Sequence, residues 1–172
     1  MAFEPHFKLT EKYKLPMYLH SRATDTEFID IVRANRHRFS TGVVHSYTGT
    51  IEEMKALVDM DLYIGINGCS MKTEELIEVV KAVPIDRLMV ETDCPYCDIR
   101  NSHASAKYVK TKFPRKAKDK YDPKSDEFSV VRDRNEPCTI VQVIEVIAAL
   151  KGISTKEVAD VSYANTLKMF NL

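Results

Sequence analysis

The chain has 172 residues, of which 44% are hydrophobic and 29% are charged, and this composition is typical of one globular domain with a sizeable core. Lysine plus arginine equals aspartate plus glutamate at 25 each, so any attraction to nucleic acid must be local. No apolar run approaches the roughly 20 residues of a membrane helix, and the first residues lack the basic and apolar regions of a secretion signal. We therefore expect an intracellular protein of the cytoplasm or nucleus with no membrane partner.

Four short apolar runs alternate with stretches of helical period in the first half of the chain. These runs are residues 17–20, 42–45, 62–66 and 87–91. Each is too short and too continuously apolar for a half-exposed antiparallel strand, so we expect strands that are buried on both faces. The alternation predicts an α/β fold with a parallel sheet and helical crossovers.

Helix starts are marked by a hydroxyl residue followed three positions later by a carboxylate. Residues 24–27 and 50–53 have this capping-box spacing, which predicts helices from about 24 and from about 50. A further helix is expected over about 73–83, because Pro84 cannot continue it.

A long polar stretch separates these elements from the end of the chain. Residues 98–136 show no helical or strand period and are expected to form a long basic loop inside a single domain that spans 1–172. An apolar helix is then expected over 137–150, Gly152 breaks it, and a capping spacing at 154–157 starts a last helix.

Metal-binding side chains follow three of the four expected strands. His20 ends the first strand, His45 ends the second, and Asp93 lies just past the fourth. In parallel α/β folds the carboxyl ends of the strands share one mouth, so side chains distant in sequence converge there. Taken singly, the histidines would be core residues and the aspartate a turn residue. Their equivalent placement favours a site for a divalent cation that keeps a position open for water.

Five motifs in order resemble those of the TatD family of metal-dependent deoxyribonucleases. They lie at residues 15–22, 42–49, 63–68, 88–95 and 134–137. Their Cys-Pro-Tyr-Cys and Asn-Gly-Cys-Ser details are similar to the eukaryotic TatD-domain deoxyribonuclease 1 group. The resemblance covers nearly the whole chain. It implies a (β/α)8 TIM-barrel-type hydrolase that cuts DNA, chiefly as a 3′ to 5′ exonuclease, with roles in DNA repair or DNA degradation.

The resemblance also assigns roles to single residues. His20, His45 and Asp93 match metal ligands, and Asp93 would in addition take a proton from the attacking water. The expected cofactor is Mg²⁺ or Mn²⁺, and Zn²⁺ is also compatible with these ligands. Arg22 is a candidate phosphate contact because its planar fork suits phosphate oxygens, with an ion pair to a helix carboxylate as the alternative.

Further residues near the expected strand ends have supporting roles. Asn67 and Gly68 would let substrate or backbone approach closely, because glycine removes the steric bar of a Cβ atom. Glu91, Arg134 and Glu136 would order neighbouring groups behind the metal ligands.

Lysines alternate with aromatic residues in the basic loop. Lys110 and Lys112 are candidate contacts for a DNA backbone whose unpaired bases stack on the rings. The alternative is a solvated loop.

The first strand of a TatD protein normally carries a His-x-His-type motif, and a bridging glutamate follows later; the chain contains neither before residue 15. The resemblance therefore implies that roughly the first three β/α units of the barrel are absent and that one sheet edge is open. A homo-oligomer could cover this edge. Fewer anionic ligands should weaken metal binding and nuclease activity. The alternative is a non-catalytic product that retains DNA or partner contacts.

Two cysteine hypotheses compete with the nuclease. Cys94 and Cys97 have the glutaredoxin spacing, which would be redox active if a helix start lowered a thiol pKa, although no convincing helix follows them. A zinc site would need two further ligands, for which Cys69, Cys138 and His103 lack a characteristic spacing.

Overall fold

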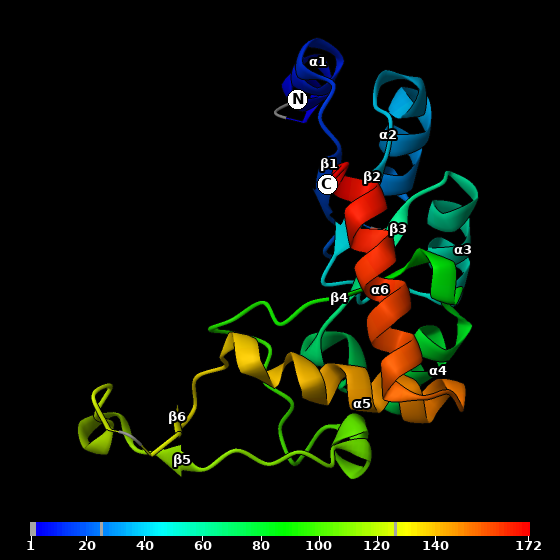
Figure 1. Cartoon of the computed structure of the whole chain (residues 1–172). Helices are drawn as coiled ribbons and strands as arrows, with labels where there is room; N and C mark the ends of the chain where they lie inside the picture. Colours follow the sequence, from blue (N-terminus) through cyan, green and yellow to red (C-terminus); the bar gives the residue numbers. More distant parts are fainter. Residues whose placement is uncertain (1–2, 25, 126) are drawn as a thin grey trace.

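A four-stranded parallel sheet forms the centre of the computed structural model, which describes residues 3–24, 26–125 and 127–172. The strands lie in the order β1 (Met17–His20), β2 (Gly42–His45), β3 (Tyr63–Ile66) and β4 (Leu88–Val90). Helices α2 to α4 lie along one side of the sheet, and α6 crosses the other (Figure 1). The α/β fold with a parallel sheet is thus confirmed.

Six α-helices surround this sheet in the described residues. They are α1 (Glu4–Tyr13), α2 (Glu27–Asn35), α3 (Ile51–Asp59), α4 (Glu74–Ala82), α5 (Ile140–Lys151) and α6 (Thr155–Phe170). Among the described residues no single helix is long and apolar enough to cross a membrane. The segments 137–151 and 155–170 meet that test only together, with a bend of 110° between them.

Helix capping follows the expected pattern at α3 but not at α2. The Glu53 amide donates to the Thr50 hydroxyl at 3.2 Å, and the Thr50 amide donates to the Glu53 carboxylate at 2.8 Å. The expected capping box at 24–27 is wrong. Helix α2 begins only at Glu27, and the Thr24 hydroxyl instead bonds that of Ser21 at 3.0 Å. Residue 25 lies outside the described residues.

Burial differs between the first strand and its neighbours. Every residue of β2 and β3 is buried, as expected, whereas Tyr18 and His20 of β1 are exposed. The expectation of two buried faces is therefore wrong for β1. The reason is the position of α6, whose Met169 packs on the inner face of the other three strands against Val43, Tyr63 and Met89.

Strand β1 also forms one edge of the sheet. It pairs only with β2, and an apolar groove of about 470 Å³ lies beside it between α1 and α2. Large apolar side chains near this edge, including Leu9, Tyr13 and Leu15, are more than half exposed. The edge expected to be open is thus open in the described chain, and its coverage by a second copy stays a prediction.

The segment from 98 to 136 projects beyond α5 (Figure 1). Apart from residue 126, which is not described, it holds two 3₁₀ turns and a short parallel pair, β5 (Arg115–Lys116) with β6 (Val130–Val131). Glu145 of α5 anchors it, because its carboxylate accepts the Lys110 amide at 2.8 Å and the Thr111 hydroxyl at 2.6 Å. Burial alone would raise the pKa of Glu145, but these hydrogen bonds lower it below its usual value.

The Glu145 anchor predicts a pH-dependent loss of stability. Because the folded-state pKa is lowered, the carboxylate stabilises the fold above the ordinary glutamate pKa of about 4.3, and this contribution disappears as pH falls further. We expect Glu145→Gln to lower the free energy of unfolding by about 1–3 kcal/mol at pH 7. The variant should also lose less stability than the wild type between about pH 5 and pH 3 in urea titrations.

The control is Glu78→Gln, which removes an exposed ion pair with Lys81 and should change stability by less than about 0.5 kcal/mol. Equal acid sensitivity of the wild type and Glu145→Gln would contradict the proposed anchor.

Candidate functional site

Parallel pairing brings the predicted metal ligands together at the carboxyl ends of the strands. His20 and His45 are register partners at the ends of β1 and β2, and their ring centroids lie 4.9 Å apart. The Nε2 atom of His45 lies 3.4 Å from the Asp93 carboxylate, which follows β4. The structure thus gathers two imidazoles and a carboxylate at the strand ends.

Glu91 orients the His45 ring. Its carboxylate lies 2.7 Å from His45 Nδ1 and accepts the Ser46 amide at 3.1 Å. The hydrogen bond to Glu91 is the main reason why the pKa of His45 is raised, although partial burial opposes it. A carboxylate that holds Nδ1 leaves Nε2 directed toward Asp93, which is the usual arrangement behind a metal-binding histidine.

Gly65 makes room for the Glu91 carboxylate. A Cβ atom built at this β3 position would lie only 2.1 Å from Glu91 Oε1. The absence of a side chain at Gly65 therefore allows the Glu91 carboxylate to lie across β3 and reach His45.

Tyr18 joins the same cluster, although sequence analysis did not single it out. Its hydroxyl lies 2.6 Å from His45 Nδ1 and 3.5 Å from Glu91 Oε1. Burial, followed by the charges of Glu91 and Asp93, raises the pKa of Tyr18, so the phenol stays protonated. Strand alternation was the available signal, because residues 18 and 20 must share one face of β1.

Asn67 lies behind the strand ends rather than on their surface. Asn67 is 0% exposed. Its side-chain Nδ2 donates to the Ser46 hydroxyl at 3.0 Å, and its side-chain Oδ1 accepts the Cys69 backbone amide at 2.9 Å. The structure thus does not place Asn67 where a substrate could touch it, because its polar atoms already have partners. Gly68 behaves as a close-approach glycine, since a Cβ atom there would lie 2.1 Å from the Cys97 carbonyl oxygen.

Asn135 holds the turn that carries Asp93. Asp93 has a positive φ of 53°, a conformation uncommon for a residue with a side chain. The buried Asn135 amide donates to the carbonyls of Thr92 at 2.8 Å and Tyr96 at 2.7 Å, on either side of Asp93. Sequence analysis weighed the two neighbours of Asn135 in the Arg-Asn-Glu-Pro segment but missed Asn135 itself.

Those neighbours, Arg134 and Glu136, brace the preceding strand. Their side chains pair at 3.0 Å, and Glu136 also accepts the Val131 amide at 3.0 Å. That backbone hydrogen bond is the main cause of the lowered pKa of Glu136. The two side chains order the β6 end of the loop, and Asn135 links this end to the Asp93 turn.

Three predicted substrate residues are exposed and stand apart from this network. Arg22 lies in the loop after β1 and makes no ion pair with a described carboxylate. The side chains of Lys110 and Lys112 are exposed in the basic loop, and within residues 3–24, 26–125 and 127–172 no hydrogen bond joins them to the strand-end residues. Their contacts with DNA stay predictions.

The donor set suits a divalent cation in its chemistry. Neighbouring ligands of one cation, each about 2.1 Å from it, stand about 3.4 Å apart in a tetrahedral site and about 3.0 Å apart in the octahedral geometry of Mg²⁺. The His45 Nε2 to Asp93 Oδ1 distance of 3.4 Å equals the tetrahedral separation and is longer than the octahedral one. Among the described residues, however, no three His, Cys, Asp or Glu side chains already share a metal-binding geometry.

The cysteines do not form a redox centre of the expected kind. Burial, with hydrogen bonds to Cys69 and Asp93, raises the pKa of Cys97 to about 12, whereas a reactive thiol needs a lowered pKa. Cys94 is exposed, and in the described chain no helix begins at the pair. These findings oppose the glutaredoxin hypothesis, and the zinc hypothesis gains no ligand cluster.

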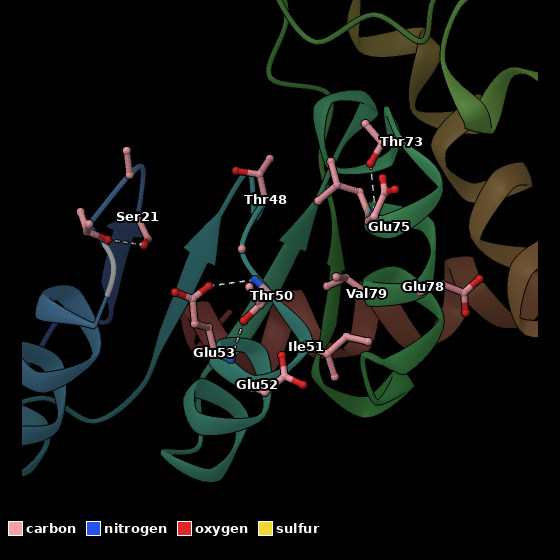
Figure 2. A pocket seen from close by; sticks show the side chains of 14 residues that line it. Ser21, Thr48, Thr50, Ile51, Glu52, Glu53, Thr73, Glu75, Glu78 and Val79 are labelled. Carbon is pink, nitrogen blue, oxygen red and sulfur yellow. Dashed lines mark hydrogen bonds between the residues drawn. The ribbon is translucent and has the colours of Figure 1, made fainter.

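A second concave surface lies at the starts of α3 and α4. This groove of about 820 Å³ is shown in Figure 2, where the Thr50 and Thr73 hydroxyls point back to cap their helices. Its lining includes four carboxylates, those of Glu52, Glu53, Glu75 and Glu78. Such a lining repels phosphate, so the groove does not suit a nucleic-acid backbone.

Solved structures share the arrangement of the whole described fold. A crystal structure of a TatD-family hydrolase from Entamoeba histolytica is 33% identical, with a TM-score of 0.89, over 98% of this chain and 55% of that one. A TatD homologue from Escherichia coli shares the fold with a TM-score of 0.74 at 20% identity. The fold is therefore that of the TIM-barrel-type α/β hydrolases, matched over about half of the barrel protein.

Sequence comparisons define the family. The model of the TatD-related DNases matches residues 1–171. A deoxyribonuclease Tat-D of Schizosaccharomyces pombe is 40% identical over 99% of this chain and 54% of its own length. A 3′-5′ ssDNA/RNA exonuclease TatD of Erwinia tasmaniensis is 30% identical over 99% and 58%. The chain belongs to the TatD-related DNase family and spans about half the length of the curated relatives that it matches.

The Asn135 clamp predicts that the Asp93 turn depends on a side chain in the next loop. The nearly isosteric Asn135→Asp replacement removes the donor to two carbonyls and should lower the free energy of unfolding by about 2–4 kcal/mol. Hydrogen exchange should become faster at residues 92–97. The control is Asn101→Asp, at an exposed position, which should leave both unchanged. Unchanged exchange in Asn135→Asp would refute the clamp.

Proposed function

We propose that this chain takes part in metal-dependent hydrolysis of DNA phosphodiester bonds, with release of nucleotides from the 3′ end. The observation that carries the proposal is the strand-end cluster, in which His45 lies between Glu91 and Asp93 with His20 beside it. The nuclease names of the family relatives support the same chemistry.

Each residue of the cluster has a defined task in this proposal. His20, His45 and Asp93 would hold the metal, for which Mg²⁺ and Mn²⁺ are the first candidates. When bound, such a cation lowers the pKa of water and stabilises charge on phosphate oxygens. Asp93 accepts a proton from the attacking water, and Glu91 keeps the His45 ring in place through Nδ1.

Solvent exposure of the cluster on the side of β1 should affect the rate of DNA hydrolysis. His20 and Tyr18 are exposed on β1, so water reaches this side of the cluster and weakens electrostatic stabilisation of the transition state. We therefore expect slower hydrolysis than in a relative whose metal ligands are all shielded from water. The second candidate function, DNA or partner binding without turnover, is favoured by this same exposed edge.

Nucleotide release from single-stranded DNA tests the proposal directly. With Mg²⁺ or Mn²⁺ the purified chain should release nucleotides, EDTA should stop the release, and Asp93→Asn should lower the rate at least about 100-fold because the variant loses an anionic ligand and a proton acceptor. Asp119→Asn, at an exposed position in the basic loop, is the matched control and should retain the wild-type rate. No release from the folded wild type would contradict hydrolysis and favour the binding function.

The basic loop predicts a salt-dependent contribution to DNA binding. If Lys110 and Lys112 contact phosphates, their combined replacement by glutamine should reduce the slope of log Kd against log salt by about 1.4 for single-stranded DNA. Lys156→Gln is the control, since this exposed lysine pairs with Asp160 on α6. An unchanged slope in the double variant would show that the loop does not contact the DNA backbone.

A further inference from the structure

Resting on the proposed function, we propose that Tyr96 is a specificity-determining residue, whose ring stacks on an unpaired base of the DNA strand entering the metal site. It would make the site prefer single-stranded ends over duplex. Tyr96 lies in the turn of Asp93, its backbone is held by Asn135, and its side chain faces solvent.

Tyr96 lies in the turn that carries Asp93. Its amide donates to the Asp93 carbonyl at 2.9 Å, which closes a four-residue turn. The Cα atoms at the two ends of such a turn lie within about 7 Å of each other. The backbone of Tyr96 is therefore anchored beside that of Asp93, the residue to which the proposed function assigns metal binding and proton transfer.

The backbone of this turn is fixed from the other side by Asn135. The Asn135 side chain donates to the Tyr96 carbonyl at 2.7 Å, and its amide donates to the Pro95 carbonyl at 3.1 Å. Asn135 itself is only 4% exposed. A ring on so restrained a backbone loses little entropy when a ligand stacks on it.

The Tyr96 side chain is largely exposed to solvent. Tyr96 is 72% exposed, and its hydroxyl makes no hydrogen bond with a described residue. Packing therefore gives no account of an aromatic side chain at this position. A flat, exposed ring on the turn that carries Asp93 suits a nucleobase, because every base offers a π face.

The chemistry also sets the class of substrate. Stacking on an aromatic side chain is worth about 1–3 kcal/mol per base and needs a base that is free of its own helix. A paired, stacked base within a duplex cannot present its face to Tyr96 until the end frays. Single-stranded DNA and frayed 3′ ends are thus the ligands that the ring would recognise.

Binding of the full 172-residue chain to labelled single-stranded DNA tests the inference. Fluorescence anisotropy in EDTA measures Kd without turnover. A set of oligonucleotides is used, each with a single abasic site at a different one of the last four nucleotides of the 3′ end. Tyr96→Leu should raise Kd about 5–150-fold, and Tyr96→Phe should keep Kd within about twofold of the wild type. An abasic site at one position should weaken DNA binding by the wild type, whereas the Kd of Tyr96→Leu should not depend on where the abasic site lies.

The matched control is Tyr163→Leu, which removes a tyrosine on α6 that is 65% exposed and should leave Kd unchanged. Equal Kd values for Tyr96→Leu and the wild type on every oligonucleotide would overturn the inference, and so would a protein partner captured through Tyr96 without base-dependent DNA affinity. A wild type that shows the base-dependent affinity but releases no nucleotide with metal would support stacking while overturning the proposed hydrolysis.

Discussion

Parallel strand pairing is the constraint on which the rest of the site depends. The chain reaches β1, β2 and β4 at positions more than 20 residues apart, and only the common direction of the strands brings their carboxyl ends to one edge. The direct pairing of His20 with His45 places their backbones side by side, and the Glu91 carboxylate then orients the His45 ring. The backbone of Glu91 is also held by the sheet, because its amide donates to the Ile66 carbonyl of β3, whereas Asp93 lies beyond the strand and needs further support.

That support comes from outside the sheet. Asn135 ties the Asp93 turn to the segment before α5, and Glu145 ties the middle of the basic loop to α5 itself. Both contacts use one buried side chain to satisfy several backbone groups, which is an economical way to order irregular structure. Helix α5 thus anchors the proposed DNA-binding loop, and the segment just before α5 holds the proposed catalytic turn.

The strands are the part of the fold that local patterns in the sequence decide. The expected bounds of β1 and β2 are those observed, β3 begins one residue later than expected, and β4 is one residue shorter at each end. These bounds could be predicted because each strand is a short apolar run with clear helix signals around it. The strand-end residues His20, His45 and Asp93 followed directly from these boundaries. Local patterns failed at Thr24, whose hydroxyl has a competing partner three residues before it.

The remaining misses concern contacts that no local pattern encodes. Whether a strand face is buried depends on what packs over it. The inner face of β2, β3 and β4 is covered by α6, which begins more than 130 residues after β1 and leaves β1 uncovered. Asn67 was expected to let substrate or backbone approach, and its burial could not be recognised because its partner Ser46 follows a different strand. Asn135 could not be recognised as a clamp, since its two acceptors are backbone carbonyls about 40 residues earlier in the chain.

Gly65 has a consequence for how such a site can change over time. The Glu91 carboxylate occupies the volume that any side chain at position 65 would need, so glycine is required there for as long as the carboxylate keeps its present position. Natural variation at position 65 therefore depends on residue 91, although Gly65 lies on β3 and Glu91 follows β4. A change from glycine to alanine, which most strands tolerate, would here displace the carboxylate from His45 without altering any other residue of the cluster.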